Sequence, residues 1–74
     1  MKELRLEYPE NGEPVSIEMR VKAGDEVQPG AIIALASMDM ATQEVEAYEG
    51  MRICVIRQTA RGFVLVVEEL DKSC

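Results

Sequence analysis

The sequence contains no histidine and no tryptophan, and its only aromatic residues are two tyrosines and one phenylalanine. Without histidine, the chain cannot build a Ser-His-Asp triad, a histidine general base or a zinc site of mixed Cys and His ligands. With so few aromatic rings, the core must consist of aliphatic side chains. The composition thus excludes several classes of enzyme, and we expect a protein that is not an enzyme.

Basic residues and long apolar runs are also scarce. The chain carries 8 basic and 14 acidic residues, a net charge of −6, whereas nucleic acids and anionic membranes attract basic surfaces. No run approaches the roughly 18 apolar residues of a membrane span, and residues 1–5 lack the apolar core of a secretion signal. We therefore expect no nucleic-acid or membrane partner and a cytoplasmic location. The acidic charge serves either solubility or attraction to a basic partner.

The chain has only two cysteines, which are too few to define a disulfide framework. Cys54 lies in an apolar, strand-like run and is interpreted as a small core residue. Cys74 ends the sequence, and we expect it to be mobile. A Cys54–Cys74 disulfide is possible, but nothing in the sequence supports it.

Alternation of apolar and polar side chains is the main structural signal. Val15, Ile17, Met19 and Val21 alternate with polar residues, which predicts a strand with one face in solvent. The other predicted strands are 3–8, 31–38, 41–47, 51–56 and 63–67, with turns at 9–14, 23–25, 28–30 and 48–50, a loop at 57–62 and a frayed end at 68–74.

Short strands at about eight-residue spacing predict an all-β sandwich or barrel. The length allows one domain that spans residues 1–74. A helix over 31–47 is the alternative, but its first half lacks a polar face at helical period. The predicted core consists of Leu6, Val15, Ile17, Val21, Val27, Ile33, Leu35, Val45, Ile53, Val55, Val64 and Val66.

A continuous series of motifs lies in the middle of the chain. Residues 24–30 read Gly-Asp-Glu-Val-Gln-Pro-Gly, residues 31–36 are apolar, residues 38–40 read Met-Asp-Met, and residues 44–50 read Glu-Val-Glu-Ala-Tyr-Glu-Gly. This series resembles the biotinyl/lipoyl carrier-domain family, with the Met pair of the biotin-carboxyl-carrier version. The resemblance implies a flattened barrel of two small antiparallel sheets with quasi-two-fold symmetry. It also places Asp39 at an exposed hairpin tip, where the family carries its attachment lysine.

The carboxylate of Asp39 cannot form the amide bond that attaches biotin or lipoate. Three interpretations of Asp39 are open: a turn residue, a contact to a basic partner, or an engineered replacement of the lysine. The flanking Met38 and Met40 are either partly buried packing residues or the retained pair that, in biotinyl domains, flanks the lysine recognised by the ligase. The remaining lysines, Lys2, Lys22 and Lys72, do not lie at the predicted tip.

We expect no catalytic residues, no bound cofactor and no metal site. The acidic residues Asp39, Glu44, Glu46 and Glu49 lack the compact loop spacing of a calcium site. The sequence then predicts a non-enzymatic carrier-type module that binds a protein partner, for which a biotin- or lipoyl-dependent enzyme complex is one candidate. The alternative is an active biotin or lipoyl carrier subunit of a carboxylase or acyl-transfer complex, or an engineered lysine-less form of one.

Overall fold

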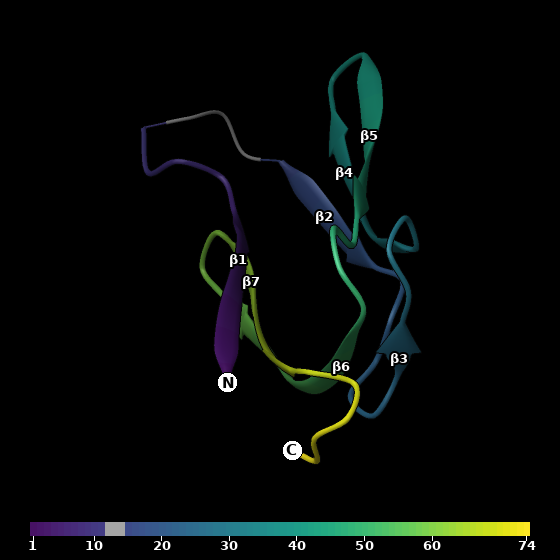
Figure 1. Cartoon of the computed structure of the whole chain (residues 1–74). Coiled ribbons are helices and arrows are strands. Elements are labelled where there is room, and N and C mark those ends of the chain that lie inside the picture. The colour runs from purple at the N-terminus through teal and green to yellow at the C-terminus, as the bar shows by residue number, and fades with distance from the viewer. Residues whose placement is uncertain (12–14) are drawn as a thin grey trace.

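The computed structural model describes residues 1–11 and 15–74, which form two antiparallel β-sheets without a helix (Figure 1). The prediction of an all-β fold is confirmed. No helix that could cross a membrane occurs among these residues. The strands are β1 (Lys2–Glu7), β2 (Ser16–Met19), β3 (Glu26–Val27), β4 (Ile32–Met38), β5 (Ala41–Glu46), β6 (Met51–Thr59) and β7 (Gly62–Glu68).

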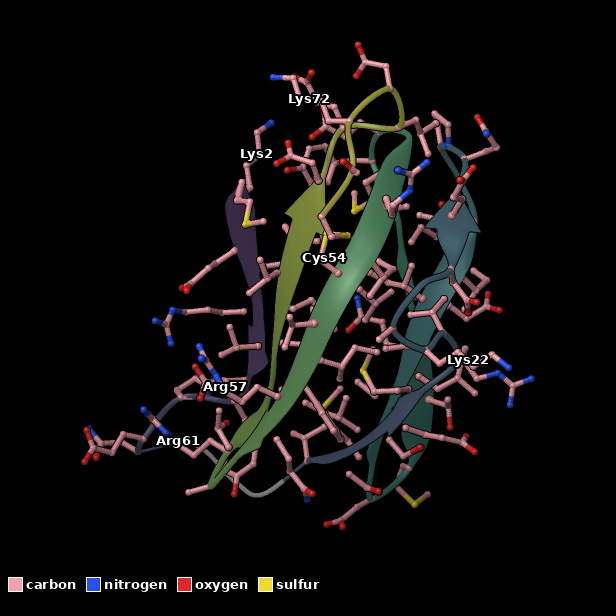
Figure 2. The ribbon with its side chains drawn as sticks, turned by 90° about the horizontal axis from the view of Figure 1, so that it is seen from below. Lys2, Lys22, Cys54, Arg57, Arg61 and Lys72 are labelled. Atoms are coloured by element: carbon pink, nitrogen blue, oxygen red, sulfur yellow. A yellow bond between two sulfur atoms is a disulfide. The ribbon has the colours of Figure 1, made fainter. Side chains whose placement is uncertain are left out.

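The larger sheet has the strand order β1-β7-β6-β3 and curls into a half-barrel (Figure 2). Its centre is the β6–β7 hairpin, closed by the two residues 60 and 61. The predicted loop at 57–62 is therefore wrong at residues 57–59, which belong to β6, and at residue 62, which begins β7. Residues 57–59 stay in β6 because each has a partner in β7, from Arg57 with Val64 to Thr59 with Gly62.

The smaller sheet has the strand order β2-β4-β5. Its central strand β4 pairs with β2 on one side and with β5 on the other. The apolar residues of β2 alternate with exposed ones, as the sequence predicts. The β4–β5 hairpin extends away from the larger sheet (Figure 1).

The two glycines of the 24–30 motif shape the turns that lead into and out of β3. Gly24 has a φ of +98° and Gly30 a φ of +89°, a conformation that side chains with a Cβ rarely adopt. The backbone N–H of Lys22 donates a hydrogen bond to the Asp25 carboxylate at 2.9 Å. The prediction of tight turns at these positions is confirmed. The short strand β3 between them was not predicted.

The core lies between the two sheets and is aliphatic, as predicted. Val27, Ile33, Ile53 and Val64 are buried as expected, together with Ala34, Ala47, Met51, Leu65 and Val67. Leu6, Val15, Ile17, Val21, Leu35, Val45 and Val66 are half-buried.

The prediction that Val55 belongs to the core is wrong, because this side chain is 46% exposed. The pairing of β6 with β7 shifts register between Ile53 and Val55. Such a bulge reverses the alternation of side chains along a strand. Ile56 therefore packs against the core in place of Val55.

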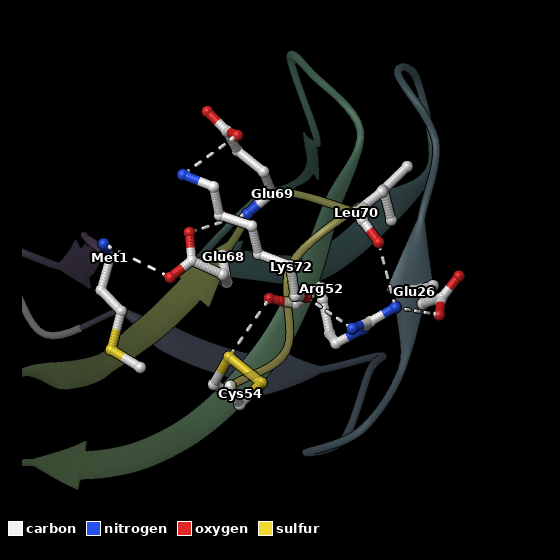
Figure 3. Close-up of a disulfide and its surroundings, with 9 residues drawn as sticks. Met1, Glu26, Arg52, Cys54, Glu68, Glu69, Leu70 and Lys72 are labelled. Carbon is white, nitrogen blue, oxygen red and sulfur yellow. Dashed lines mark hydrogen bonds and ion pairs between the residues drawn. A yellow bond between two sulfur atoms is a disulfide. The ribbon is translucent and has the colours of Figure 1, made fainter.

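The segment 69–74 is attached to β6, so the prediction of a frayed end is wrong (Figure 3). The guanidinium of Arg52 donates hydrogen bonds to the carbonyl oxygens of Lys72 at 2.6 Å and Leu70 at 3.1 Å. Cys54 and Cys74 form a disulfide with their Cα atoms 5.5 Å apart. The assignments of Cys54 as a core thiol and Cys74 as a mobile residue are corrected, because the return of this segment along β6 brings the two sulfurs together.

We predict that the double variant Cys54→Ser/Cys74→Ser loses about 3 kcal/mol of unfolding free energy. The disulfide joins residues 20 positions apart, and a cross-link over a loop of this size restricts the unfolded chain by about that amount. Urea unfolding of the oxidised protein and of the double variant measures the difference. The reduced wild-type protein serves as the control and should behave as the double variant does. Equal stability of the oxidised protein and the double variant would contradict the cross-link.

We predict that Gly62→Ala is more destabilising than Gly24→Ala. A Cβ at Gly62 would overlap the backbone carbonyl oxygen of Leu6 and lie 2.9 Å from Cδ1 of Ile17, whereas a Cβ at Gly24 would meet nothing within 4 Å. Gly24→Ala should cost about 1 kcal/mol through its positive φ alone. Thermal or urea unfolding of the two variants checks the order, and a milder effect at Gly62 would contradict this close approach of β1 and β7.

Candidate functional site

The tip of the β4–β5 hairpin is the first candidate site. β4 ends at Met38 and β5 begins at Ala41, so Asp39 and Met40 alone form the turn. The pairing is regular next to the turn, with Met38 opposite Ala41 and Ser37 opposite Thr42. Asp39 is exposed at this tip, where the sequence places it.

The backbone of the turn does not require an aspartate. No described residue other than glycine has a positive φ, so the turn is not one of the mirror-image types that favour Asp, Asn or Gly. A lysine would adopt the same backbone conformation without strain. The interpretation of Asp39 as a residue chosen for a tight turn thus gains no support from the backbone.

The two methionines beside Asp39 are exposed to different degrees. The side chain of Met40 is 97% exposed and that of Met38 is 50% exposed. For Met40, the interpretation as a partly buried packing residue is wrong. An exposed, flexible thioether contributes little to the folded state, but it can fit an irregular apolar pocket on another protein.

All charged residues of the hairpin are acidic. Residues 32–46 include Asp39, Glu44 and Glu46 but no lysine or arginine. None of these three carboxylates takes part in an ion pair with another described residue; the ion pairs lie mainly on the larger sheet and on the segment 69–74. The carboxylates of the hairpin are therefore not neutralised by ion pairs within the described part of the chain.

The three lysines lie away from the tip (Figure 2). Lys2 is in β1 and pairs with Glu49 at 3.0 Å, and this hydrogen-bonded ion pair raises the pKa of the lysine ammonium. Lys72 pairs with Glu69 at 3.6 Å in the segment 69–74. Lys22 belongs to the turn that precedes β3. No lysine thus occupies the place of an attachment residue.

A shallow apolar hollow of about 270 Å³ lies beside the middle of the hairpin and reaches Met38, next to the turn. The sequence did not predict it, because it forms between strands far apart in the chain. The hollow is lined mainly by Leu6, Tyr8, Pro9, Val15, Ile17, Ala36, Met38 and Val45, with Arg5, Glu7 and Gln43 as polar lining residues.

Glu7 is the acidic residue of this hollow. It accepts hydrogen bonds from the Thr59 hydroxyl at 2.6 Å and from the Arg5 guanidinium at 3.2 Å. These bonds lower the pKa of the Glu7 carboxyl, which keeps it ionised and is the opposite of what a general acid requires. Among the described residues, no group of three Cys, Asp or Glu side chains is placed to hold a metal ion.

Comparisons with known proteins add no assignment. No family model, no curated protein and no solved structure matches the chain. The resemblance of residues 24–30 and 38–40 to carrier domains therefore stays a prediction from the sequence.

We predict that Met40→Ala leaves the stability of the fold within about 0.5 kcal/mol of wild type, as is usual for exposed positions. Met51→Ala is the matched control, because Met51 is 2% exposed and the loss of a buried methionine side chain costs about 2–5 kcal/mol. Urea unfolding measures both variants. A large loss at Met40 would mean that the tip packs against the fold, and the tip would then be a poor docking element.

Proposed function

We propose that the chain is a non-enzymatic, protein-binding module of the biotinyl/lipoyl carrier type, which lacks the modifiable lysine and docks through its β4–β5 hairpin. The single observation that carries this proposal is the projecting hairpin tip. Its two residues are Asp39 and Met40, both exposed, and no amine is present where the carrier family attaches its cofactor.

The order of the strands supports the proposed quasi-two-fold symmetry. Exchanging β1 with β5, β2 with β6 and β4 with β7 converts the order β1-β7-β6 of the larger sheet into β5-β4-β2, which is the order of the smaller sheet read from β5. β3 has no counterpart in this exchange, because β6 runs through a two-residue turn directly into β7. Three strands of each half thus correspond in order and pairing, but the second half has no strand that corresponds to β3.

The surface of the hairpin supports docking to a protein rather than catalysis. Its tip presents the thioether of Met40 beside the carboxylate of Asp39, and neither Asp39 nor Glu44 and Glu46 further along β5 has an ionic partner among the described residues. A partner with an apolar pocket and a basic rim complements such a tip in shape and charge. By the family resemblance, a biotin- or lipoyl-dependent enzyme complex is the candidate partner.

The alternative is an active biotin or lipoyl carrier subunit. That function requires an acylated lysine, and Lys2, Lys22 and Lys72 all lie away from the hairpin tip. The intact mass of the protein purified from its native host separates the two functions. An unmodified mass supports the docking module, whereas the addition of one biotinyl or lipoyl group favours the carrier.

We predict that Asp39→Lys makes the chain a substrate for biotin ligase. The lysine amine would be exposed at the tip, and Met38 and Met40 would flank it as in the family pattern. Incubation with ligase, biotin and ATP, followed by intact mass measurement, should show one added biotinyl group.

The matched control is Asp39→Arg, which introduces the same charge without an amine that can be acylated. It should remain unmodified, as should the wild-type protein. A folded Asp39→Lys variant that accepts neither biotin nor lipoate from the corresponding ligases would count against the carrier-type assignment.

A further inference from the structure

The outer edge of β5 differs from the other three sheet edges that the described residues form. Natural edge strands are usually kept from pairing with other chains by shortness, by lysine or proline, or by bulges. β3 has two residues and β2 has four, while β1 carries Lys2 and Arg5 in ion pairs. β5 has six residues without lysine, arginine or proline, and it has no strand on its outer side among the described residues.

The geometry of the hairpin determines which backbone groups β5 presents at this edge. In a hairpin closed by two residues, the pair next to the turn, here Met38 and Ala41, exchanges both backbone hydrogen bonds. The next pair then points its N–H and C=O groups outward, and the pattern alternates. The 3.5 Å approach of the Ser37 and Thr42 hydroxyl oxygens fits such a non-hydrogen-bonded pair, whose side chains lie closer together. The N–H and C=O groups of Thr42 and Glu44 therefore face away from β4.

The negative charge of this edge favours pairing with a basic strand over pairing with a second copy of the chain. Glu44 and Glu46 lie on β5, Asp39 lies at the tip, and no basic residue occurs in residues 32–46. A second copy of the chain would bring the same carboxylates to the edge, and like charges across a strand pair are destabilising. An extended segment with Lys or Arg at every second position would place opposite charges beside Glu44 and Glu46 instead.

We infer that the outer edge of β5 binds an extended, basic segment of a partner protein, which adds to the smaller sheet as a fourth strand. Main-chain hydrogen bonds to Thr42 and Glu44 provide the pairing, and charge pairs with Glu44 and Glu46 favour basic segments over others. The inference rests on the proposed function, because it names the chemistry of the partner that the hairpin recognises.

The test uses a capped synthetic peptide that alternates lysine and valine over six residues. Titration into the full chain, followed by amide NMR, should shift the Thr42 and Glu44 signals. Glu44→Pro removes an outward N–H that β4 does not use and should weaken binding at least tenfold. The same peptide methylated on all of its backbone nitrogens keeps its charge but cannot donate main-chain hydrogen bonds in either strand direction, and it should bind at least tenfold more weakly to the wild-type chain.

The charge contribution is tested separately. The double variant Glu44→Gln/Glu46→Gln should weaken binding several-fold and reduce its salt dependence. The control Glu3→Gln/Glu69→Gln changes the net charge equally but alters other parts of the molecule, and it should bind as wild type does. If both double variants weaken binding equally, the attraction is non-specific and the inference is wrong.

Two further results would overturn the inference. One is undiminished binding of the methylated peptide, which remains decisive even if Glu44→Pro does not fold. The other is self-association of the chain through β5 in sedimentation experiments, which would make a second copy the occupant. Neither result affects the acceptance of biotin by Asp39→Lys, so failure of this inference and failure of the proposed function are distinguishable.

Discussion

The pairing of β6 with its neighbours is the interaction on which the rest of the structure depends. β6 pairs with β7 along most of its length and with β3 at its start, and its residues Met51 and Ile53 are both buried. Arg52 connects the same strand to Glu26 in β3, with 2.7 Å between guanidinium and carboxylate, and to the segment 69–74. In a chain with few aromatic side chains, one well-connected strand thus organises most of the larger sheet.

This organisation leaves the hairpin of the smaller sheet free to project. Its lower half contributes Ile33 and Ala34 to the core, while its upper half is exposed from Ser37 to Glu44. The central position of β4 between β2 and β5 holds the base of the hairpin. The proposed docking element therefore combines a fixed base with a tip whose side chains do not contribute to the core, so the residues at the tip can change without loss of the fold.

The sequence predicted those features that depend on neighbours along the chain. Alternation located the longer strands, Gly24 and Gly30 marked turns with positive φ, and the motif placed Asp39 at a hairpin tip. β3 escaped prediction because two residues are too few for any periodicity to be recognised. The exposure of Val55 was missed because a bulge leaves no local signature in an apolar run.

Features that depend on residues distant in the sequence could not be predicted in the same way. The hydrogen bond from Thr59 to Glu7 and the apolar hollow both join the first strand to segments that follow much later. The Cys54–Cys74 bond depends on the path of the chain after β7, which no pattern in residues 69–74 indicates. The sequence also did not indicate that the Asp39–Met40 turn lacks a positive φ, which excludes the mirror-image turn types.

The disulfide makes residues 54–74 a covalent ring that contains the whole of β7. While the ring is closed, a pulling force applied at residue 74 reaches β6 directly and bypasses the β6–β7 turn. Once thiols open it, the same force must first peel residues 70–74 from the guanidinium of Arg52, and then it acts on the end of β7. Whether the disulfide is oxidised or reduced therefore determines whether a force at residue 74 acts first on β6 or on β7. Disulfides persist mainly in oxidising compartments.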